Sequence, residues 1–183
     1  MGGAAVPAGV IADAVAAAKA YLRLEAGGED ALLAGFAAAA IGLCEAYCAQ
    51  ALVTRGFTDE HAATGGWRRL GAAPVVAIDA VIGLAAEGGG FALAVGSYAI
   101  DIDGDATGWV RVTQPGAAGR VRVAYRAGAA ATWDALPAAL AQGIAMLVAH
   151  LFAHRDDEAA PPAAVAALWR PYRRLRLAGG AMR

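Results

Sequence analysis

The side-chain pattern changes twice along this chain, and that change restricts the fold more than any other feature. Both ends repeat apolar residues every three to four positions, which is the period of an amphipathic helix. The middle, residues 57–128, instead holds more than half of the 24 glycines and short β-branched runs. This order predicts an α+β fold that is mainly α, a helical bundle of about four helices with a small antiparallel β-rich insertion between helices 2 and 3.

The helical period predicts where each helix runs. The four expected helices span residues 10–24, 29–53, about 134–155 and 161–170. We expect Gly27 and Gly28 to end the first helix, because glycine is the usual residue just past a helix end. Pro137 suits a first helical turn, and Pro171 should end or kink the last helix because its ring meets a carbonyl four residues back.

The middle segment is typical of antiparallel strands. Apolar residues alternate with arginine in two of its runs, which is the period of a strand with one face in solvent. The expected strands are 75–78, 98–102, 109–112 and 120–125, separated by turns at 87–90, 103–105 and 115–116. We expect a meander or sandwich of about five or six strands.

These elements divide the chain into four consecutive segments. Residues 8–55 form an N-terminal helical hairpin, and 56–130 form the β-rich insertion. Residues 131–176 hold C-terminal helices that pack on the hairpin, and 177–183 form a flexible tail. At 183 residues the whole is expected to be one domain.

The composition indicates a folded chain that lacks a strong overall charge. Apolar residues make up 59% and charged residues 17%, so some apolar surface is expected to be covered by partners. A net charge of −1 does not favour nucleic acid or an anionic membrane as a partner. Residues 135–154 lack charged side chains over a membrane-spanning length, but Pro137, His150 and His154 favour a buried or interfacial helix. We therefore expect no membrane partner.

An acidic cluster, Asp101, Asp103 and Asp105, superficially resembles a calcium loop. An EF-hand loop needs glycine at its sixth position and glutamate at its twelfth. Ala106 and Val112 stand there instead. We interpret the aspartates as residues that shape a turn between two strands.

No other cluster has the residues of a metal or catalytic site. His150 and His154 are spaced to share a zinc ion, but the intervening residues offer no glutamate. Cys44 and Cys48 lack a second pair and are expected to be buried. Because the nucleophile, base and electrophile of an enzyme do not occur together, we expect no catalytic residue, no metal and no cofactor.

The C-terminal segment combines large aromatic side chains with guanidinium groups. Tryptophan, tyrosine and arginine dominate the energetics of protein interfaces, and guanidinium pairs with carboxylate or phosphate. The candidate partner-binding residues are Trp169, Arg170, Tyr172, Arg173, Arg174 and Arg176. Two other interpretations stay open: a solvated basic helix end, and a small nucleic-acid-binding module that uses this arginine-rich C-terminus.

The order of short motifs resembles the head–tail adaptor (connector) family of tailed phages and gene transfer agents. The motifs are AKAYLRL at 18–24, AAxxxCEAYxxxAL at 39–52, LxxxPVxxIxxV at 70–81, YxID at 98–101, VxYxAG at 123–128 and LPAALxQxIxxLVAHxxxxR at 136–155. Each motif is weak alone, and their order and spacing together are fairly specific. The resemblance covers about residues 10–176.

The resemblance implies a structural role at the head–tail interface of a virion or phage-like particle. Copies of such adaptors form a homo-oligomeric ring, usually a dodecamer, beneath the portal protein. A stopper or tail-terminator protein binds the other side, and DNA passes through the channel without sequence-specific binding. The C-terminal segment of an adaptor typically docks into the portal, which would assign that role to residues 169–176. The resemblance also places the β-rich insertion against neighbouring subunits or the tail.

Overall fold

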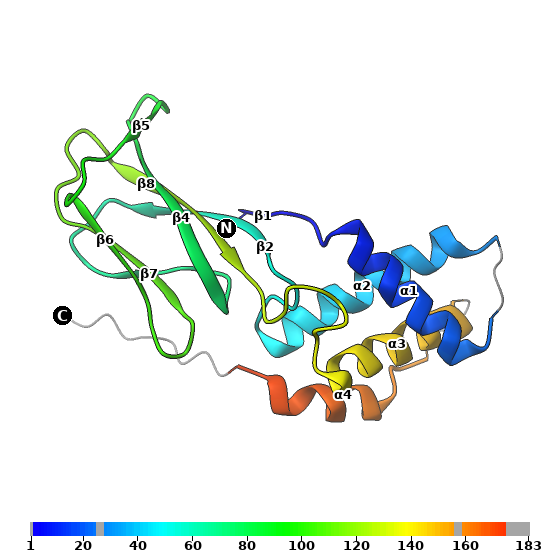
Figure 1. Ribbon diagram of the computed structural model, residues 1–183. Coiled ribbons are helices and arrows are strands. Elements are labelled where there is room, and N and C mark those ends of the chain that lie inside the picture. The colour runs from blue at the N-terminus through cyan, green and yellow to red at the C-terminus, as the bar shows by residue number, and fades with distance from the viewer. Residues whose placement is uncertain (1, 25–27, 156–158, 175–183) are drawn as a thin grey trace. The chain divides into compact units, whose positions relative to one another are not determined.

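The computed structural model describes residues 2–24, 28–155 and 159–174 of the chain. Its contacts divide it into two compact units, and Figure 1 shows the helices in one and the strands in the other. The strand unit holds Met1–Ala5 and Val53–Ala131, and the helical unit holds Val6–Leu52 and Thr132–Arg183. Each unit is described by itself below.

The helical unit contains the four predicted α-helices. They are α1 (Ala8–Leu22), α2 (Asp30–Cys48), α3 (Ala138–Ala153) and α4 (Ala163–Trp169), followed by the 3₁₀ turn η1 (Arg170–Tyr172). The change from α-helix to 3₁₀ turn occurs beside Pro171, as its ring predicts. The apolar period thus located the helices correctly.

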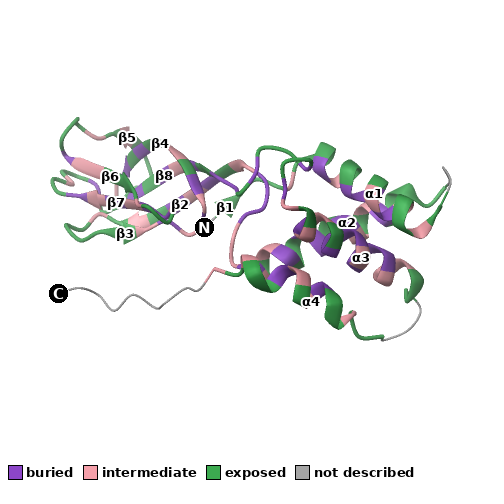
Figure 2. Ribbon diagram, turned by 60° about the horizontal axis from the view of Figure 1, so that its bottom comes forward, coloured by how far each residue is buried: buried purple, intermediate pink, exposed green. Residues whose placement is uncertain are grey.

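α3 is the central helix of this unit, because α1, α2 and α4 all pack against it. Its buried residues include Leu140, Ile144 and Val148, and Figure 2 shows more buried surface on α3 than on α1. Residues 135–154 were expected to form a buried or interfacial helix, and α3 occupies 138–153 of them as the buried helix of this unit. Among the described residues, α2 is the helix long and apolar enough to span a membrane. Core helices pass the same test, and α2 buries one face in this unit.

Two helices end earlier than predicted. α1 ends at Leu22 and α2 at Cys48, and the residues that follow, Arg23 and Ala49, adopt left-handed backbone with φ of 57° and 55°. In each case the capping N–H donates to carbonyls of the last turn, which ends the helix without a glycine. The second helix was expected to reach residue 53, so its predicted end was wrong by about one turn.

The strand unit contains two antiparallel sheets. The first has the order β1 (Gly2–Gly3), β2 (Arg55–Ala62), β8 (Arg120–Ala127), β4 (Val75–Leu84) and β5 (Gly90–Ala92). The second has the order β3 (Arg68–Arg69), β7 (Gly108–Val112) and β6 (Tyr98–Ile102). The α+β class and the antiparallel pairing are confirmed. The β part is larger than the predicted small insertion in a mainly α chain, because β1, β2, β3 and β5 lack the β-branched runs that predict strands.

Alternating side chains of β7 and β8 build the core between the sheets. Val110, Val121, Val123 and Tyr125 are each 1% exposed or less. Gly128, the residue directly after β8, has a φ of 159°, and a Cβ at this position would lie 2.2 Å from the Thr54 backbone nitrogen. Glycine is therefore required where β8 leaves the sheet.

Candidate partner-binding site

Trp169, the first of the predicted partner-binding residues, lies in the core of the helical unit. It is 4% exposed, and its indole Nε1 donates to the Leu140 carbonyl at 3.4 Å. Gly143 on α3 provides the space for the indole, because a Cβ at that position would lie 2.2 Å from Nε1. Burial therefore removes Trp169 from the surface that a partner could contact.

The next residues of the segment are anchored to the end of α2. The Arg174 backbone nitrogen donates to the Cys48 carbonyl at 2.9 Å, and Gln50 Nε2 donates to the Tyr172 carbonyl at 3.1 Å. The Arg173 guanidinium lies over the Tyr47 ring at 5.8 Å. These contacts hold the backbone of 170–174 in place, so the arginine side chains extend from a fixed segment.

Arg170 and Arg173 are exposed, and neither has a carboxylate partner among the described residues. Tyr172 and Arg174 are half-buried beside them. The structure thus brings four of the six predicted residues together in one short segment. The fifth, Trp169, lies beneath them, and Arg176 lies outside the described residues. An exposed pair of guanidinium groups can bind a carboxylate or phosphate of a partner.

The acidic turn after β6 uses its central carboxylate internally. Asp103 Oδ1 accepts from the backbone nitrogens of Asp105 at 3.0 Å and Thr107 at 2.9 Å, and Oδ2 accepts from Trp109 Nε1 at 2.9 Å. The predicted role of Asp103 in shaping the turn is confirmed. No group of three or more His, Cys, Asp or Glu side chains able to hold a metal occurs within the described ranges.

The predicted histidine and cysteine pairs both have ordinary structural surroundings. The rings of His150 and His154 lie 4.6 Å apart near the end of α3, and His150 Nε2 lies 3.0 Å from the Ala159 carbonyl oxygen. Cys44 and Cys48 are free thiols with no exposed surface, as predicted. Burial raises the pKa of the Cys44 thiol, so it stays protonated.

A buried carboxylate in the strand unit was not predicted as a structural residue. Asp59 on β2 is 3% exposed, and its Oδ2 accepts from the Tyr125 hydroxyl at 2.9 Å and the Gly71 nitrogen at 2.6 Å. The same hydroxyl accepts from the Ala72 nitrogen at 2.9 Å. These bonds fix the loop before β4 onto the sheet. Only the tertiary pairing of β2 with β8 brings the two side chains together, so no local pattern could have shown it.

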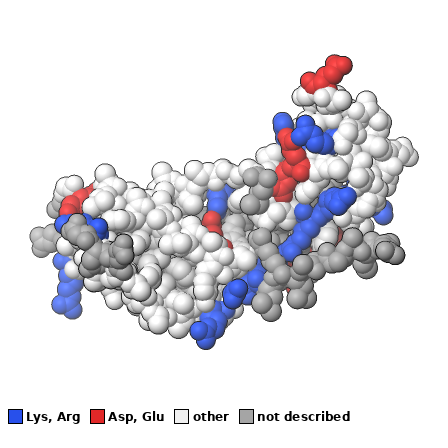
Figure 3. All heavy atoms as spheres, turned by 180° about the vertical axis from the view of Figure 1, so that it is seen from behind, with Lys and Arg blue, Asp and Glu red and all other residues white. Residues whose placement is uncertain are grey.

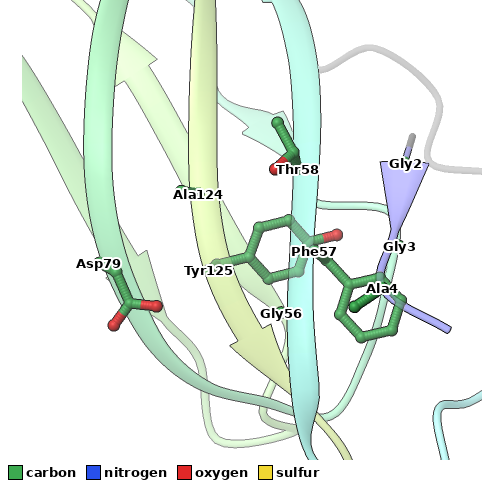
Figure 4. A pocket seen from close by; sticks show the side chains of 9 residues that line it. All are labelled: Gly2, Gly3, Ala4, Gly56, Phe57, Thr58, Asp79, Ala124 and Tyr125. Atoms are coloured by element: carbon green, nitrogen blue, oxygen red, sulfur yellow. The ribbon is translucent and has the colours of Figure 1, made fainter. Parts of the chain in front are cut away.

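A shallow depression lies between β1, β2 and β8 (Figure 4). It is lined by Gly2, Gly3, Ala4, Gly56, Phe57, Thr58, Asp79, Ala124 and Tyr125. The Phe57 and Tyr125 rings stack at 5.8 Å on its floor. The charged lining residue, Asp79, already pairs with Arg126 at 3.2 Å. Because Asp79 and the Tyr125 hydroxyl already have partners within the chain, we assign no ligand to it.

The second sheet brings together a group of residues that was not predicted from the sequence. Trp109 and Arg111 on β7 point to the same face, and the Arg111 guanidinium lies 4.9 Å from the centre of the Trp67 ring. Trp67 is 43% exposed. The alternation of Trp109 and Arg111 could have indicated this face, but the pairing of β3 with β7 could not be predicted.

Figure 3 shows that uncharged residues cover most of the face in view, and that the charged side chains lie in separate groups.

Comparisons with solved structures match the chain along its whole length. It is similar to a chain from the neck of an empty gene transfer agent (GTA) particle computed with C6 symmetry, at 32% identity and a TM-score of 0.76. That match covers 99% of this chain and 100% of the other. A chain from the neck of a native GTA particle computed with C12 symmetry matches at 31% identity and a TM-score of 0.71, again over 99% and 100%.

A third similar chain comes from the virion of a native GTA particle. It is 31% identical with a TM-score of 0.69, over 97% of this chain and 93% of that one. No family model matches the chain, and no curated protein matches it significantly. Identity above 30% over nearly all of both chains shows common ancestry as well as a shared fold. The chain belongs to the family of these proteins from the necks of GTA particles.

Proposed function

We propose that this chain is a structural subunit of the neck of a GTA or tailed-phage particle, acting as the head–tail adaptor. The observation that carries the proposal is the whole-length similarity to chains from GTA necks. The order of the adaptor-like motifs along the sequence supports the same role. The role is mechanical rather than catalytic: the subunit joins other proteins of the particle.

The symmetry of the related necks supports a ring of identical copies. Those necks were computed with C6 and C12 symmetry, and a dodecamer satisfies both. In the proposed assembly the ring lies between the portal protein and a stopper or tail-terminator protein. DNA passes through the central channel without sequence-specific contacts, and no membrane takes part.

We propose that the basic segment after α4 is the portal-docking surface. Arg170 and Arg173 are exposed and lack carboxylate partners within the described residues, and Tyr172 and Arg174 lie beside them. Charge-assisted bonds from such guanidinium groups to carboxylates of a partner are stronger than neutral hydrogen bonds. The segment belongs to the C-terminal helical residues 131–176, and we assign contacts with neighbouring copies to the insertion of residues 56–130.

The test replaces the docking arginines and leaves the core intact. The triple variant Arg170→Ala, Arg173→Ala, Arg174→Ala keeps Trp169 and the backbone bond to Cys48. It should therefore fold, and its thermal unfolding temperature should drop only slightly because the contact of Arg173 with Tyr47 is lost. We expect it to lose capture by the purified portal protein and to reduce the yield of tailed particles. The matched control replaces three arginines of β8: Arg120, Arg122 and Arg126.

The outcomes separate docking from other roles of the arginines. Normal portal capture by the docking variant would refute this surface, and equal losses in both variants would indicate a nonspecific effect of charge. If the wild-type chain instead bound DNA with an affinity that falls steeply with salt, the nucleic-acid-binding function would be favoured.

A further inference from the structure

The second sheet of the strand unit has two open edges with opposite charge. Within the described residues, β6 and β3 each pair only with β7, which lies between them. Asp101 is exposed on β6, and Arg69 lies on β3. Neither side chain has a hydrogen-bond or ion-pair partner among the described residues. By contrast, Arg120, Arg122 and Arg126 on the first sheet all pair with carboxylates.

The two charges lie on the same face of this sheet and in the same row. Trp109 on β7 is the register partner of Asp101 on one side and of Arg69 on the other. The adjacent row contains Ala99 on β6, its partner Arg111 on β7, and Trp67, whose ring stacks under the Arg111 guanidinium. The first row therefore ends in the acidic Asp101 at β6 and the basic Arg69 at β3. The second row ends in the small Ala99 at β6 and the large Trp67 just before β3.

The β6 edge also exposes apolar surface. Ile100 and Ile102 are 46% and 39% exposed, and Val95 in the preceding loop is fully exposed. An open edge strand with apolar side chains is a template for pairing with another chain, and proteins normally block or cover it. Asp101 lies between these two isoleucines but on the other face, so it does not interrupt the apolar surface.

We infer that β6 of one copy pairs with β3 of the next copy, so that the second sheet continues from subunit to subunit around the ring. This inference rests on the proposed ring assembly. Because β3 and β6 both run antiparallel to β7, they are parallel to each other. A neighbouring copy related by rotation can therefore place its β3 beside β6, so that the cross-strand rows of the second sheet continue in register into the next copy. Arg69 of the neighbour then lies beside Asp101, and its Trp67 lies beside the small Ala99.

Charge selects this pairing over the symmetric alternatives. Two β6 edges would bring one Asp101 towards another, and two β3 edges would bring arginines together; like charges across strands are destabilising. Pairing of unlike edges is head-to-tail, and head-to-tail contacts produce rings when the rotation closes. β3 has two residues, so each junction contributes few backbone hydrogen bonds. The contact therefore forms stably within the assembled neck rather than between free copies.

The test is disulfide cross-linking within assembled particles. Particles are produced with a chain that carries Asp101→Cys and Arg69→Cys. Within one copy these positions are two strands apart, about 9.5 Å, which is beyond the reach of a disulfide, about 7 Å between Cα atoms. The native Cys44 and Cys48 are fully buried and do not compete. Oxidation should thus convert the chain into a ladder of covalent oligomers on a non-reducing gel.

The control chain carries Arg69→Cys with Ile82→Cys, because Ile82 is a comparably exposed strand residue of the first sheet. It should remain monomeric. Particles that contain the double-cysteine chain but give no ladder would overturn the edge pairing and leave the neck assignment intact. Absence of the wild-type chain from purified particles would instead overturn the neck assignment, and with it this inference.

A charge-swap series provides a second measurement if cysteine variants fail to assemble. Asp101→Arg or Arg69→Asp alone places like charges at every junction, and each should reduce incorporation into particles by about tenfold or more. The combination of both restores opposite charges and should recover most of the loss. Wild-type incorporation of either single variant, or no recovery in the combination, would contradict the inference.

Discussion

The close contact between Gly143 and Trp169 makes the stability of the helical unit sensitive to one methyl group. We predict that Gly143→Ala destabilises the unit. The new Cβ would lie 2.2 Å from the indole Nε1 and 2.9 Å from Cδ1, so a buried, rigid ring must move. The shift also weakens the bond from Nε1 to the Leu140 carbonyl.

The expected magnitude is the difference between two opposing effects. Alanine is more favourable than glycine within a helix by about 1 kcal/mol. Overpacking a well-packed core costs about 1–3 kcal/mol, and a weakened buried hydrogen bond adds about 0.5–1.5 kcal/mol. The net loss in the free energy of unfolding should therefore be about 1–3 kcal/mol. Gly42→Ala on α2 is the matched control, because a Cβ there has nothing within 4 Å.

Urea unfolding followed by circular dichroism at 222 nm measures this difference, because the signal reports mainly the helical unit. With a slope of about 1–3 kcal/mol per molar urea, Gly143→Ala should lower the midpoint by about 1 M and Gly42→Ala should raise it slightly. In a Trp169→Leu background, Gly143→Ala should no longer destabilise, since the ring that it meets is gone. A Gly143→Ala chain as stable as the wild type, with the indole still present, would refute the packing argument.

Three further predictions concern buried polar groups and thiols. Tyr125→Phe removes the hydroxyl that donates to Asp59, and should reduce the free energy of unfolding by about 1–3 kcal/mol in urea. Burial lowers the pKa of His61, so the unfolded chain binds its proton more tightly. The free energy of unfolding should therefore fall as the pH drops below about 6.5, the pKa of an unfolded histidine, towards the lower pKa of folded His61. His61→Gln should remove this pH dependence, which urea unfolding at several pH values can measure. Cys44 and Cys48 should not react with a thiol reagent such as DTNB in the folded chain and should react fully in urea, so rapid native labelling would contradict their burial.

The helices could be predicted from sequence because their apolar period is local. Their ends could not, because Arg23 and Ala49 adopt a left-handed conformation that is normally taken by glycine. The residues directly after Cys48, Ala-Gln-Ala-Leu, favour helix by propensity alone. Contacts beyond the helical period decide the end instead. The distant Arg174 backbone nitrogen donates to the Cys48 carbonyl, and nearby the Glu45 side chain accepts from the Leu52 nitrogen.

The strands were predicted only where β-branched residues alternate. β2 was missed because its sequence, RGFTDEHA, reads as polar, although Phe57 and Asp59 point into the core. The partner-binding segment stays a prediction, and its composition could not show which of its aromatic residues is buried. Trp169 is buried because Gly143, twenty-six positions earlier, leaves room for it, and that is a tertiary relationship.

Cryo-electron microscopy of particles from a host strain that lacks this gene tests whether the chain forms the neck ring between head and tail. We expect heads that carry a portal but lack the neck ring and a joined tail. Complementation with the wild-type gene should restore a symmetric ring of this fold, with twelve copies, in the neck density. Particles with complete necks and tails in the absence of the gene would show that the chain is not the head–tail adaptor.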